Sequence, residues 1–364
     1  MTFLFLLLIC WAVGFILFAK ISLDQEETTE MPDVKVSVII PARNEEKNLP
    51  FLLESLKRQS LKPYEVIVVN DFSEDKTKEI AKSFDVKVID NPPIPVGWTG
   101  KNWALWNGYL HSSGQILIFL DADVRLSEDG IEKLTKALFK SKGAISVIPY
   151  HKTEKFYEKL CMIVNILGVF AFTSPYERKS KQKGLYGSCI ALFREDYQKI
   201  GGHKSICSKV TDDLSLGKRL SSFNINIENY LGIDKVFFRM YPNGIKSQIH
   251  GIAKSAALSM QLLQRKTILL IALWVLGLTL SGFLTPFLFF IRHPLLKIFL
   301  LAYLLYFVQI LYLQRYIGNF GIVMPLFHFV STAFFLFMVL YSFYQIKFTG
   351  SVWWKGRQIE VGGK

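Results

Sequence analysis

Three long apolar stretches in the C-terminal part of the chain restrict what it can fold into. They lie at residues 267–291, 295–313 and 321–346 of a 364-residue sequence. Each is close to the ~20 apolar residues that a helix needs to cross the hydrocarbon core of a membrane. Because backbone polar groups find no water there, such stretches must be helical. The sequence therefore predicts three transmembrane helices, with kinks at Pro286 and Pro325.

A further apolar stretch lies at the N-terminus, where residues 2–19 carry no charge. It lacks the basic start and the small-residue cleavage site of a secretory signal peptide. We therefore predict an uncleaved transmembrane anchor over residues 1–22. An acidic linker follows it, containing Asp24, Glu26, Glu27, Glu30 and Asp33.

Composition narrows the functional class of the protein. Hydrophobic residues make up 51% of the chain and charged residues only 20%, which together argue against an ordinary soluble enzyme and against a disordered chain. The formal net charge is +13. The positive charge suits an anionic membrane or a phosphorylated substrate, and we predict no nucleic-acid partner. The cysteines have no C-x-x-C spacing, so they indicate neither a zinc site nor a redox motif; they are Cys10, Cys161, Cys189 and Cys207.

Residues 34–150 have a different pattern from the apolar ends of the chain. Short β-branched runs such as VKVSVIIPA, YEVIVVND and GQILIFLDAD alternate with amphipathic segments of helical length. This alternation predicts an α/β fold with a mostly parallel sheet and flanking helices. Such sheets bind ligands at the carboxyl ends of their strands, so functional residues should follow the apolar runs.

The region between this domain and the apolar stretches is less regular. Residues 160–173 form an apolar run too short to span a membrane, which we interpret as a core or interfacial helix. The basic run 177–183 is expected to be a solvated loop, with a diphosphate or lipid headgroup contact as the alternative. Residues 251–266 predict an amphipathic helix on the membrane surface.

The predicted topology contains a conflict. Basic residues such as Lys254 and Arg265 put the 34–266 region on the cytoplasmic side, and three further spans would then put the tail outside. The tail is itself basic, with Lys347, Lys355 and Arg357. Either one stretch is re-entrant or the tail departs from the tendency.

Acidic residues follow two of the apolar runs. Asp121 and Asp123 form a D-x-D pair after QILIFL, where two carboxylates can share Mg²⁺ or Mn²⁺ whose remaining ligands come from substrate phosphates. An ordinary acidic turn is the alternative. Asp71 follows VIVVN and could accept hydrogen bonds from a base or a ribose, the alternative being an N-cap for the next helix.

Two other motifs complete the set. The string GWTGKN at 97–102 departs from the P-loop pattern, which excludes an NTPase, but its backbone and Lys101 could meet a diphosphate. Thr211, Asp212 and Asp213 open a helical segment. Paired acids there complement a helix dipole, and one of them could instead act as a general base.

Taken in order, these motifs resemble those of the family 2 inverting glycosyltransferases with the GT-A fold, over residues 34–240. The strings that carry the resemblance are IIPARNEEKNL, VVNDFSEDKT, GKNWALWNG, LDAD, GLYGSCIALFRE and TDDLSLGKRL. The resemblance implies that Asp71 holds uracil, Lys101 lies beside the diphosphate, Asp121 contacts the ribose, Asp123 binds the metal ion and Asp213 is the base. It also implies that the nucleotide sugar is lined by Pro41, Ala42, Arg43, Glu45 and Asp212, the last replacing a more usual Glu.

Sequence outside that region looks like the membrane glycosyltransferases of carotenoid and hopanoid pathways. The string RMYPNGIKSQIHGIAKS and a closing WWKGR carry this likeness. It implies transfer of a hexose, expected to be glucose, from a UDP-sugar to a lipid-soluble acceptor, expected to be a carotenoid carboxylate. The predicted domains are an anchor at 1–22, a glycosyltransferase domain at 34–240, an interfacial segment at 241–266, transmembrane helices at 267–346 and a basic tail at 347–364. We predict a multi-pass cell-membrane protein with a cytoplasmic catalytic domain.

Several alternatives stay open at this point. A hopanoid, a glycerolipid or a polyprenyl phosphate could be the acceptor, and a membrane protein that only binds nucleotide sugars would need Asp71 and Asp123 but not Asp213. The absence of a Q-x-x-R-W motif after Asp213 weakens a processive polymerase. Few ionisable residues lie in the apolar stretches, which argues against an ion pathway.

Overall fold

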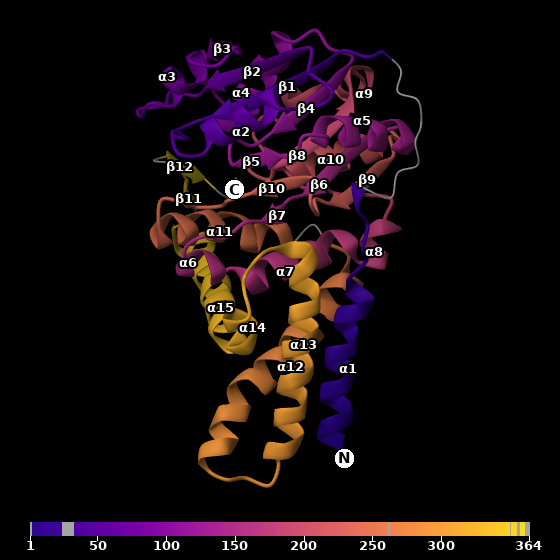
Figure 1. The fold of residues 1–364 in the computed structure, drawn as a ribbon, viewed down its shortest axis with the longest axis vertical. Helices are drawn as coiled ribbons and strands as arrows, with labels where there is room; N and C mark the ends of the chain where they lie inside the picture. Colours follow the sequence, from indigo (N-terminus) through magenta and orange to yellow (C-terminus); the bar gives the residue numbers. More distant parts are fainter. Residues whose placement is uncertain (1, 24–32, 261–262, 350, 355–356, 361–364) are drawn as a thin grey trace.

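The computed structural model describes residues 2–23, 33–260, 263–349, 351–354 and 357–360. A sheet with flanking helices forms one end of the molecule and a group of long helices forms the other (Figure 1). Most of the predicted acidic linker and part of the basic tail lie outside the described residues.

The larger sheet has seven strands in the order β3-β2-β1-β4-β8-β6-β9. Neighbouring strands run parallel except β8, which is antiparallel to both β4 and β6, so the predicted mostly parallel sheet is a mixed one. β4 and β6 are buried along their whole length, as expected for apolar runs covered on both faces. The strands are β1 (Val36–Ala42), β2 (Glu65–Asn70), β3 (Lys87–Asp90), β4 (Ile116–Leu120), β6 (Ala144–Ile148), β8 (Cys189–Phe193) and β9 (Ile227–Leu231).

Helices flank this sheet, and a smaller sheet adjoins it in the order β5-β10-β7. The short strands are β5 (Val124–Leu126), β7 (Tyr150–His151) and β10 (Val236–Phe238). The helices of this part are α2 (Leu49–Lys57), α3 (Thr77–Lys82), α4 (Gly100–Leu110), α5 (Gly130–Ser141), α9 (Arg194–Lys199), the 3-10 helix η2 (Gly202–Ile206) and α10 (Asp212–Ser222). Apolar side chains from both sheets and from α2 and α5 form one continuous core.

Three long helices lie side by side at the other end of the molecule (Figure 1): α1 (Thr2–Leu17), α12 (Arg265–Phe290) and α13 (Leu296–Ile317). Buried hydrogen bonds join them, since the Trp274 indole donates to Gln309 Oε1 (2.8 Å) and Gln309 Nε2 donates to the carbonyl of Trp11 (3.0 Å). Gly14 allows this close approach, because a Cβ there would lie 2.6 Å from the Trp274 indole nitrogen.

The N-terminal helix is shorter than the predicted anchor. α1 has 16 residues, below the ~20 that a span needs. The residues that follow Leu17 join the sheet domain. The Leu231 N–H donates to the carbonyl of Ile21 (2.6 Å), and Leu23 is buried in the domain core.

By length and composition, three helical stretches of the described residues could cross a membrane: Phe156–Arg178, α12 and α13. The first includes the run that we expected to be too short. In the structure it is divided into α6 (Phe156–Lys159), α7 (Met162–Thr173) and α8 (Pro175–Arg178). α7 lies across the domain-side ends of the long helices (Figure 1), and its apolar residues are part of a core shared with them.

The third predicted span, 321–346, does not form one long helix. The chain there forms α14 (Val323–Leu326) and a 17-residue α15 (His328–Tyr344), which is shorter than the three candidate spans of the described residues. The segment 321–346 begins at the end of the helix bundle nearest the sheet domain, where the Thr153 N–H donates to Asn319 Oδ1 (2.6 Å). The segment also ends there, where the Ser342 hydroxyl of α15 donates to the carbonyl of Ala253 in α11 (2.6 Å).

This segment turns inside the helix bundle. The Tyr303 hydroxyl, in the second turn of α13, donates to the carbonyl of Leu326, and the His328 ring lies 4.5 Å from the Tyr303 ring, centroid to centroid. Figure 1 shows α14 and α15 ending well short of the loop that joins α12 and α13. The segment therefore enters and leaves the helix bundle at the end nearest the sheet domain, the path that a re-entrant segment would take.

The predicted amphipathic helix at 251–266 begins earlier, as α11 (Ile245–Met260). Gln248, Ile252 and Ala253 are buried between the sheet domain and the long helices, so α11 joins the two parts rather than lying free on a surface. Beyond α15 a π-helical turn, η3 (Gln345–Thr349), leads to a two-stranded antiparallel sheet of β11 (Ser351–Trp354) and β12 (Arg357–Glu360).

Candidate active site

One cavity of about 500 Å³ opens at the carboxyl ends of the parallel strands. β1 ends at Ala42, while Asp71 and Asp121 directly follow β2 and β4. Every residue that the sequence predicted for the site lines this cavity: Pro41, Ala42, Arg43, Glu45, Asp71, Lys101, Asp121, Asp123, Asp212 and Asp213. The geometry thus brings the predicted residues together, and their individual roles remain predictions.

Asp71 is buried at one end of the cavity. Its carboxylate accepts a hydrogen bond from Asn91 Nδ2 (2.9 Å), and Arg43 donates to the carbonyls of Asp71 and Phe72 (2.9 Å each). The alternative role as an N-cap is wrong, because Asp75 accepts from the N–H of Thr77 at the start of α3 (3.0 Å). Arg43 therefore holds the loop that carries Asp71.

Lys101 lies among the acids of the cavity. Its ammonium is 2.9 Å from Asp121 Oδ1 and 3.4 Å from Asp212 Oδ2. Burial by itself would lower the pKa of Lys101, but Asp121, Asp212 and Asp213 outweigh it and raise that pKa above its ordinary value. Lys101 is therefore a permanent cation that connects the D-x-D pair with the start of α10.

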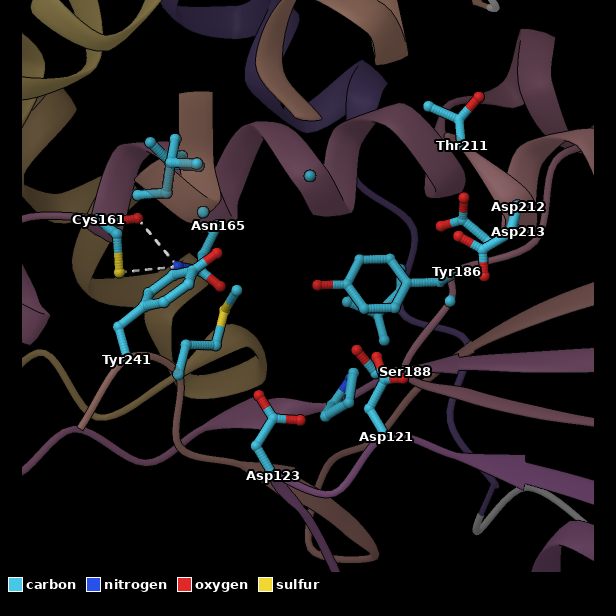
Figure 2. A pocket seen from close by; sticks show the side chains of 18 of the residues that line it. Asp121, Asp123, Cys161, Asn165, Tyr186, Ser188, Thr211, Asp212, Asp213 and Tyr241 are labelled. Atoms are coloured by element: carbon cyan, nitrogen blue, oxygen red, sulfur yellow. Dashed lines mark hydrogen bonds between the residues drawn. The ribbon is translucent and has the colours of Figure 1, made fainter. Parts of the chain in front are cut away.

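Asp121 and Asp123 both face the cavity, arranged with Asp213 around the ring of Tyr186 (Figure 2). The described residues contain no cluster of three or more His, Cys, Asp or Glu side chains that could hold a metal ion. Two carboxylates provide only hard oxygen ligands. This donor set fits Mg²⁺ or Mn²⁺ if phosphate oxygens supply the remaining ligands.

Asp213 lies in the first turn of α10 and lines the same cavity. Its carboxylate accepts from the N–H of Leu214 (2.8 Å) and lies against Gly187, where a Cβ would come within 2.9 Å of Asp213 Oδ2. The acids of the Thr211-Asp212-Asp213 motif thus begin a helix and also line the cavity, and the role of a general base stays a prediction.

Sequence reasoning missed Asn102, which positions this helix. Asn102 is fully buried, and its Nδ2 donates to the carbonyls of Ile206, Cys207 and Lys209 (2.9–3.1 Å). These carbonyls belong to the segment leading into α10, so Asn102 connects it to the residue next to Lys101. Its position in the GWTGKN motif could have indicated a role at the site, but we considered that motif only as a departure from the P-loop pattern.

Two tyrosines and an asparagine were also missed. Tyr186, Tyr241 and Asn165 line the cavity; Figure 2 shows Tyr186 near Asp213, and Tyr241 with Asn165 near Cys161. Burial raises the pKa of Tyr186, and the charges of Asp123 and Asp213 raise it further, so its hydroxyl remains a hydrogen-bond donor. The string RMYPNG was the available signal for Tyr241.

The other half of the cavity is apolar. Its walls come from α7, α11, α12 and α15, and include Val164, Gly168, Phe172, Ile252, Ile268, Ile271, Phe335, Met338 and Val339. Ile271 is six residues into α12, which at 1.5 Å per residue is roughly 9 Å along that helix. We call this half the apolar arm; it joins the acidic residues to the interior of the helix bundle.

Comparison with known proteins gives a consistent result. The profile of glycosyl transferase family 2 matches residues 37–201. Two relatives, from Staphylococcus aureus strains USA300 and MRSA252, are both 4,4'-diaponeurosporenoate glycosyltransferases. Each is 32% identical over 357 residues, covering 96% of this chain and 95% of the relative.

A solved structure shares the fold. It is a mannosyltransferase from Pyrobaculum calidifontis, in complex with GDP-Man and Mn²⁺. The similarity covers 93% of this chain and 95% of that chain, with a TM-score of 0.54 and 15% sequence identity. At that identity the likeness shows a common fold alone.

Proposed function

This chain belongs to glycosyl transferase family 2, and we propose that it transfers glucose from UDP-glucose to the carboxylate of a membrane-embedded carotenoid acid such as 4,4'-diaponeurosporenoate. The observation that carries the proposal is the single cavity, acidic at one end and apolar at the other. A long polyene ending in a carboxylate has the same two-part chemistry. The name of the full-length relatives supports the same acceptor. Membership of an enzyme family leaves no reason to prefer a protein that only binds nucleotide sugars.

The donor would occupy the acidic half of the cavity. In this proposal Asp71 accepts hydrogen bonds from the uracil, and Pro41, Ala42, Arg43 and Glu45 border the nucleoside. Asp121 contacts the ribose and Lys101 meets the diphosphate. Because Lys101 is paired with Asp121 and Asp212 in this structure, its ammonium must exchange part of that pairing for diphosphate oxygens as the donor binds.

Asp123, with Asp121, would hold Mg²⁺ or Mn²⁺. The proposal is supported by the oxygen donor set, and a protein of the same fold was solved with Mn²⁺. When bound, such an ion neutralises charge on the departing diphosphate. The chain contributes the positive charge of Lys101 to the same end.

The transfer itself is a displacement at the anomeric carbon. An acceptor carboxylate oxygen forms the new C–O bond while the bond to the diphosphate breaks, and the electron pair leaves with UDP. Attack from the opposite face inverts the anomeric centre. A carboxylic acid has already lost its proton at neutral pH. Asp213 and the Tyr186 hydroxyl would therefore orient this acceptor, whereas for a hydroxyl acceptor Asp213 would remove the proton.

Charge distribution supports a cytoplasmic catalytic domain. The domain-side ends of the long helices and of α6–α8 carry the basic residues Lys20, Lys159, Arg178, Lys179, Arg265, Lys266 and Arg315. The opposite loop, between α12 and α13, has Arg292, with Lys297 at the start of α13. Basic residues favour the cytoplasmic side.

The test is direct transfer in membranes. Membranes containing the full chain are incubated with isotope-labelled UDP-glucose and 4,4'-diaponeurosporenoate, and the lipid extract is analysed by mass spectrometry. We expect a labelled glucosyl ester that is absent with the Asp123→Asn variant. Parallel incubations use UDP-galactose and GDP-mannose as donors, and a hopanoid, a glycerolipid and a polyprenyl phosphate as acceptors. Labelled product only with one of these would contradict the proposed donor or acceptor.

A further inference from the structure

Gly168 is an unusual residue in the apolar arm. It lies in the middle of α7, and a Cβ built on it would meet no atom within 4 Å. Glycines of the long helices differ, since a Cβ on Gly14 or Gly277 would lie 2.4–2.8 Å from neighbouring side chains. Those glycines are explained by close helix packing. Packing does not explain Gly168.

A glycine inside a helix lowers the stability of that helix. Relative to alanine, glycine destabilises a helix interior by roughly 0.5–1 kcal/mol. Gly168 has no positive backbone φ that would require glycine. What it leaves instead is open volume in the cavity wall, on the same face of α7 as Val164, Ala171 and Phe172.

The position of Gly168 along the arm matters. Phe172, one turn further along α7, packs edge-on against Tyr186, with ring centroids 5.5 Å apart. Tyr186 precedes Gly187, which contacts Asp213. Gly168 therefore lies on the cavity wall one helical turn, roughly 6 Å, from the residue that packs on Tyr186, between Phe172 and Asn165.

We propose that Gly168 determines acceptor specificity: by leaving the cavity wide one turn of α7 away from Phe172 and Tyr186, it admits the rigid stem of a polyene acid. A rigid stem cannot bend around a side chain placed there. A short carboxylic acid, which ends before this point, does not need the space. This inference rests on the proposed function, because it assumes that the arm receives the acceptor.

The experiment is a size series at this position in the full-length protein: Gly168→Ala, Gly168→Leu and Gly168→Phe. The matched control is Leu276→Phe, which adds the same ring at a half-exposed position of α12 outside the cavity. Three quantities are measured: transfer to 4,4'-diaponeurosporenoate, transfer to 2,4-hexadienoate, and UDP-glucose binding. Binding of 4,4'-diaponeurosporenoate itself is followed by its visible absorbance in the purified protein.

We expect Gly168→Ala to have the smallest effect of the series on the long polyene, because a methyl adds the least volume, and to be at least as stable as the unmodified protein, because helix propensity improves. Gly168→Phe should lower binding of the long polyene and transfer to it by about tenfold or more, because the added ring occupies volume that the polyene needs. Transfer to 2,4-hexadienoate and UDP-glucose binding should change by less than about threefold. Leu276→Phe should change none of these quantities.

Two results would overturn the inference. One is undiminished transfer to the long polyene by Gly168→Phe, and the other is an equal loss for both acceptors together with loss of UDP-glucose binding. Failure of the proposed function looks different. In that case the unmodified protein transfers glucose to neither acceptor, and Gly168→Phe still decides, through polyene binding, whether Gly168 controls the arm.

Discussion

At the scale of single residues, uncharged neighbours determine where the acids of the site point. Asp213 lies against Gly187, and Asn102 connects the segment before α10 to the start of α4 through three backbone carbonyls. Gly187 and Asn102 are both uncharged, and neither can act as an acid or a base in a reaction. Their effect is to keep Asp213 and Lys101 facing one cavity.

The role of Asp213 can be tested with acceptors that differ in their proton. We expect Asp213→Asn to retain substantial single-turnover transfer to a carboxylate acceptor, because no proton has to be removed. Transfer to a hydroxyl acceptor should fall by about 10²–10⁴-fold, as is typical when a general base is lost. Equal losses with both acceptor types would show that Asp213 is not the base.

The contact between Gly187 and Asp213 gives a second prediction. In Gly187→Ala the new methyl would approach Asp213 Oδ2 to 2.9 Å, so the carboxylate must move. We expect the turnover rate to fall by roughly tenfold or more while the KM for the donor changes little. Gly168→Ala is the matched control, because the same methyl meets nothing there. Similar rates for the two variants would contradict this prediction.

At the scale of elements, the segment α14–α15 closes one side of the apolar arm. Phe335, Met338 and Val339 of α15 line the arm, while Ser331 bonds to the carbonyl of Leu160 and Ser342 to that of Ala253. These hydrogen bonds hold α15 against α7 and α11, so the wall of the arm is fixed to the sheet domain.

A re-entrant α15 places the tail on the domain side of the membrane. We expect a membrane-impermeant maleimide, in a Cys207→Ser background, to label Lys347→Cys from the same side as Lys140→Cys on the sheet domain. His293→Cys, in the loop between α12 and α13, should label from the opposite side. Labelling of Lys347→Cys together with His293→Cys would mean that α15 crosses the membrane.

At the scale of the whole molecule, stability depends on groups buried without charge. His203 is buried in the sheet domain, where its Nδ1 is 2.8 Å from the Tyr197 hydroxyl; His151 is buried where that domain meets the helices. Burial lowers the pKa of each to about 4, from 6.5. Both histidines are therefore neutral in the folded protein at neutral pH.

This predicts a loss of stability in mild acid. Between pH 6.5 and 4 the unfolded chain binds more protons than the folded one, so stability falls as the pH drops through this window. Each histidine should cost roughly 2 kcal/mol at pH 5. The check is the thermal midpoint of the detergent-solubilised protein at pH 7.5 and pH 5. His203→Gln should lower the midpoint at pH 7.5 and reduce its pH dependence; an unchanged pH dependence would contradict the prediction.

Much of the candidate site was predictable from the sequence because it depends on local order along the chain. Asp71 and Asp121 follow buried strands, and the carboxyl ends of parallel strands meet at one edge of a sheet whatever the details of packing. The antiparallel β8 was not predictable, because the run CIALF has the same apolar pattern in either direction. Gly168 and Gly187 look alike in sequence, and only their neighbours give them different roles.

The sequence by itself determined the family, the α/β domain, the acids at the strand ends and the apolar character of the C-terminal helices, since each depends on residue type and spacing along one segment. The tertiary structure decided which apolar segments have the length to cross a membrane and which one turns back. It also decided that the acids and the helix bundle share one cavity. These depend on contacts between segments far apart in the chain, such as Ser342 with Ala253, which hydrophobic periodicity does not encode.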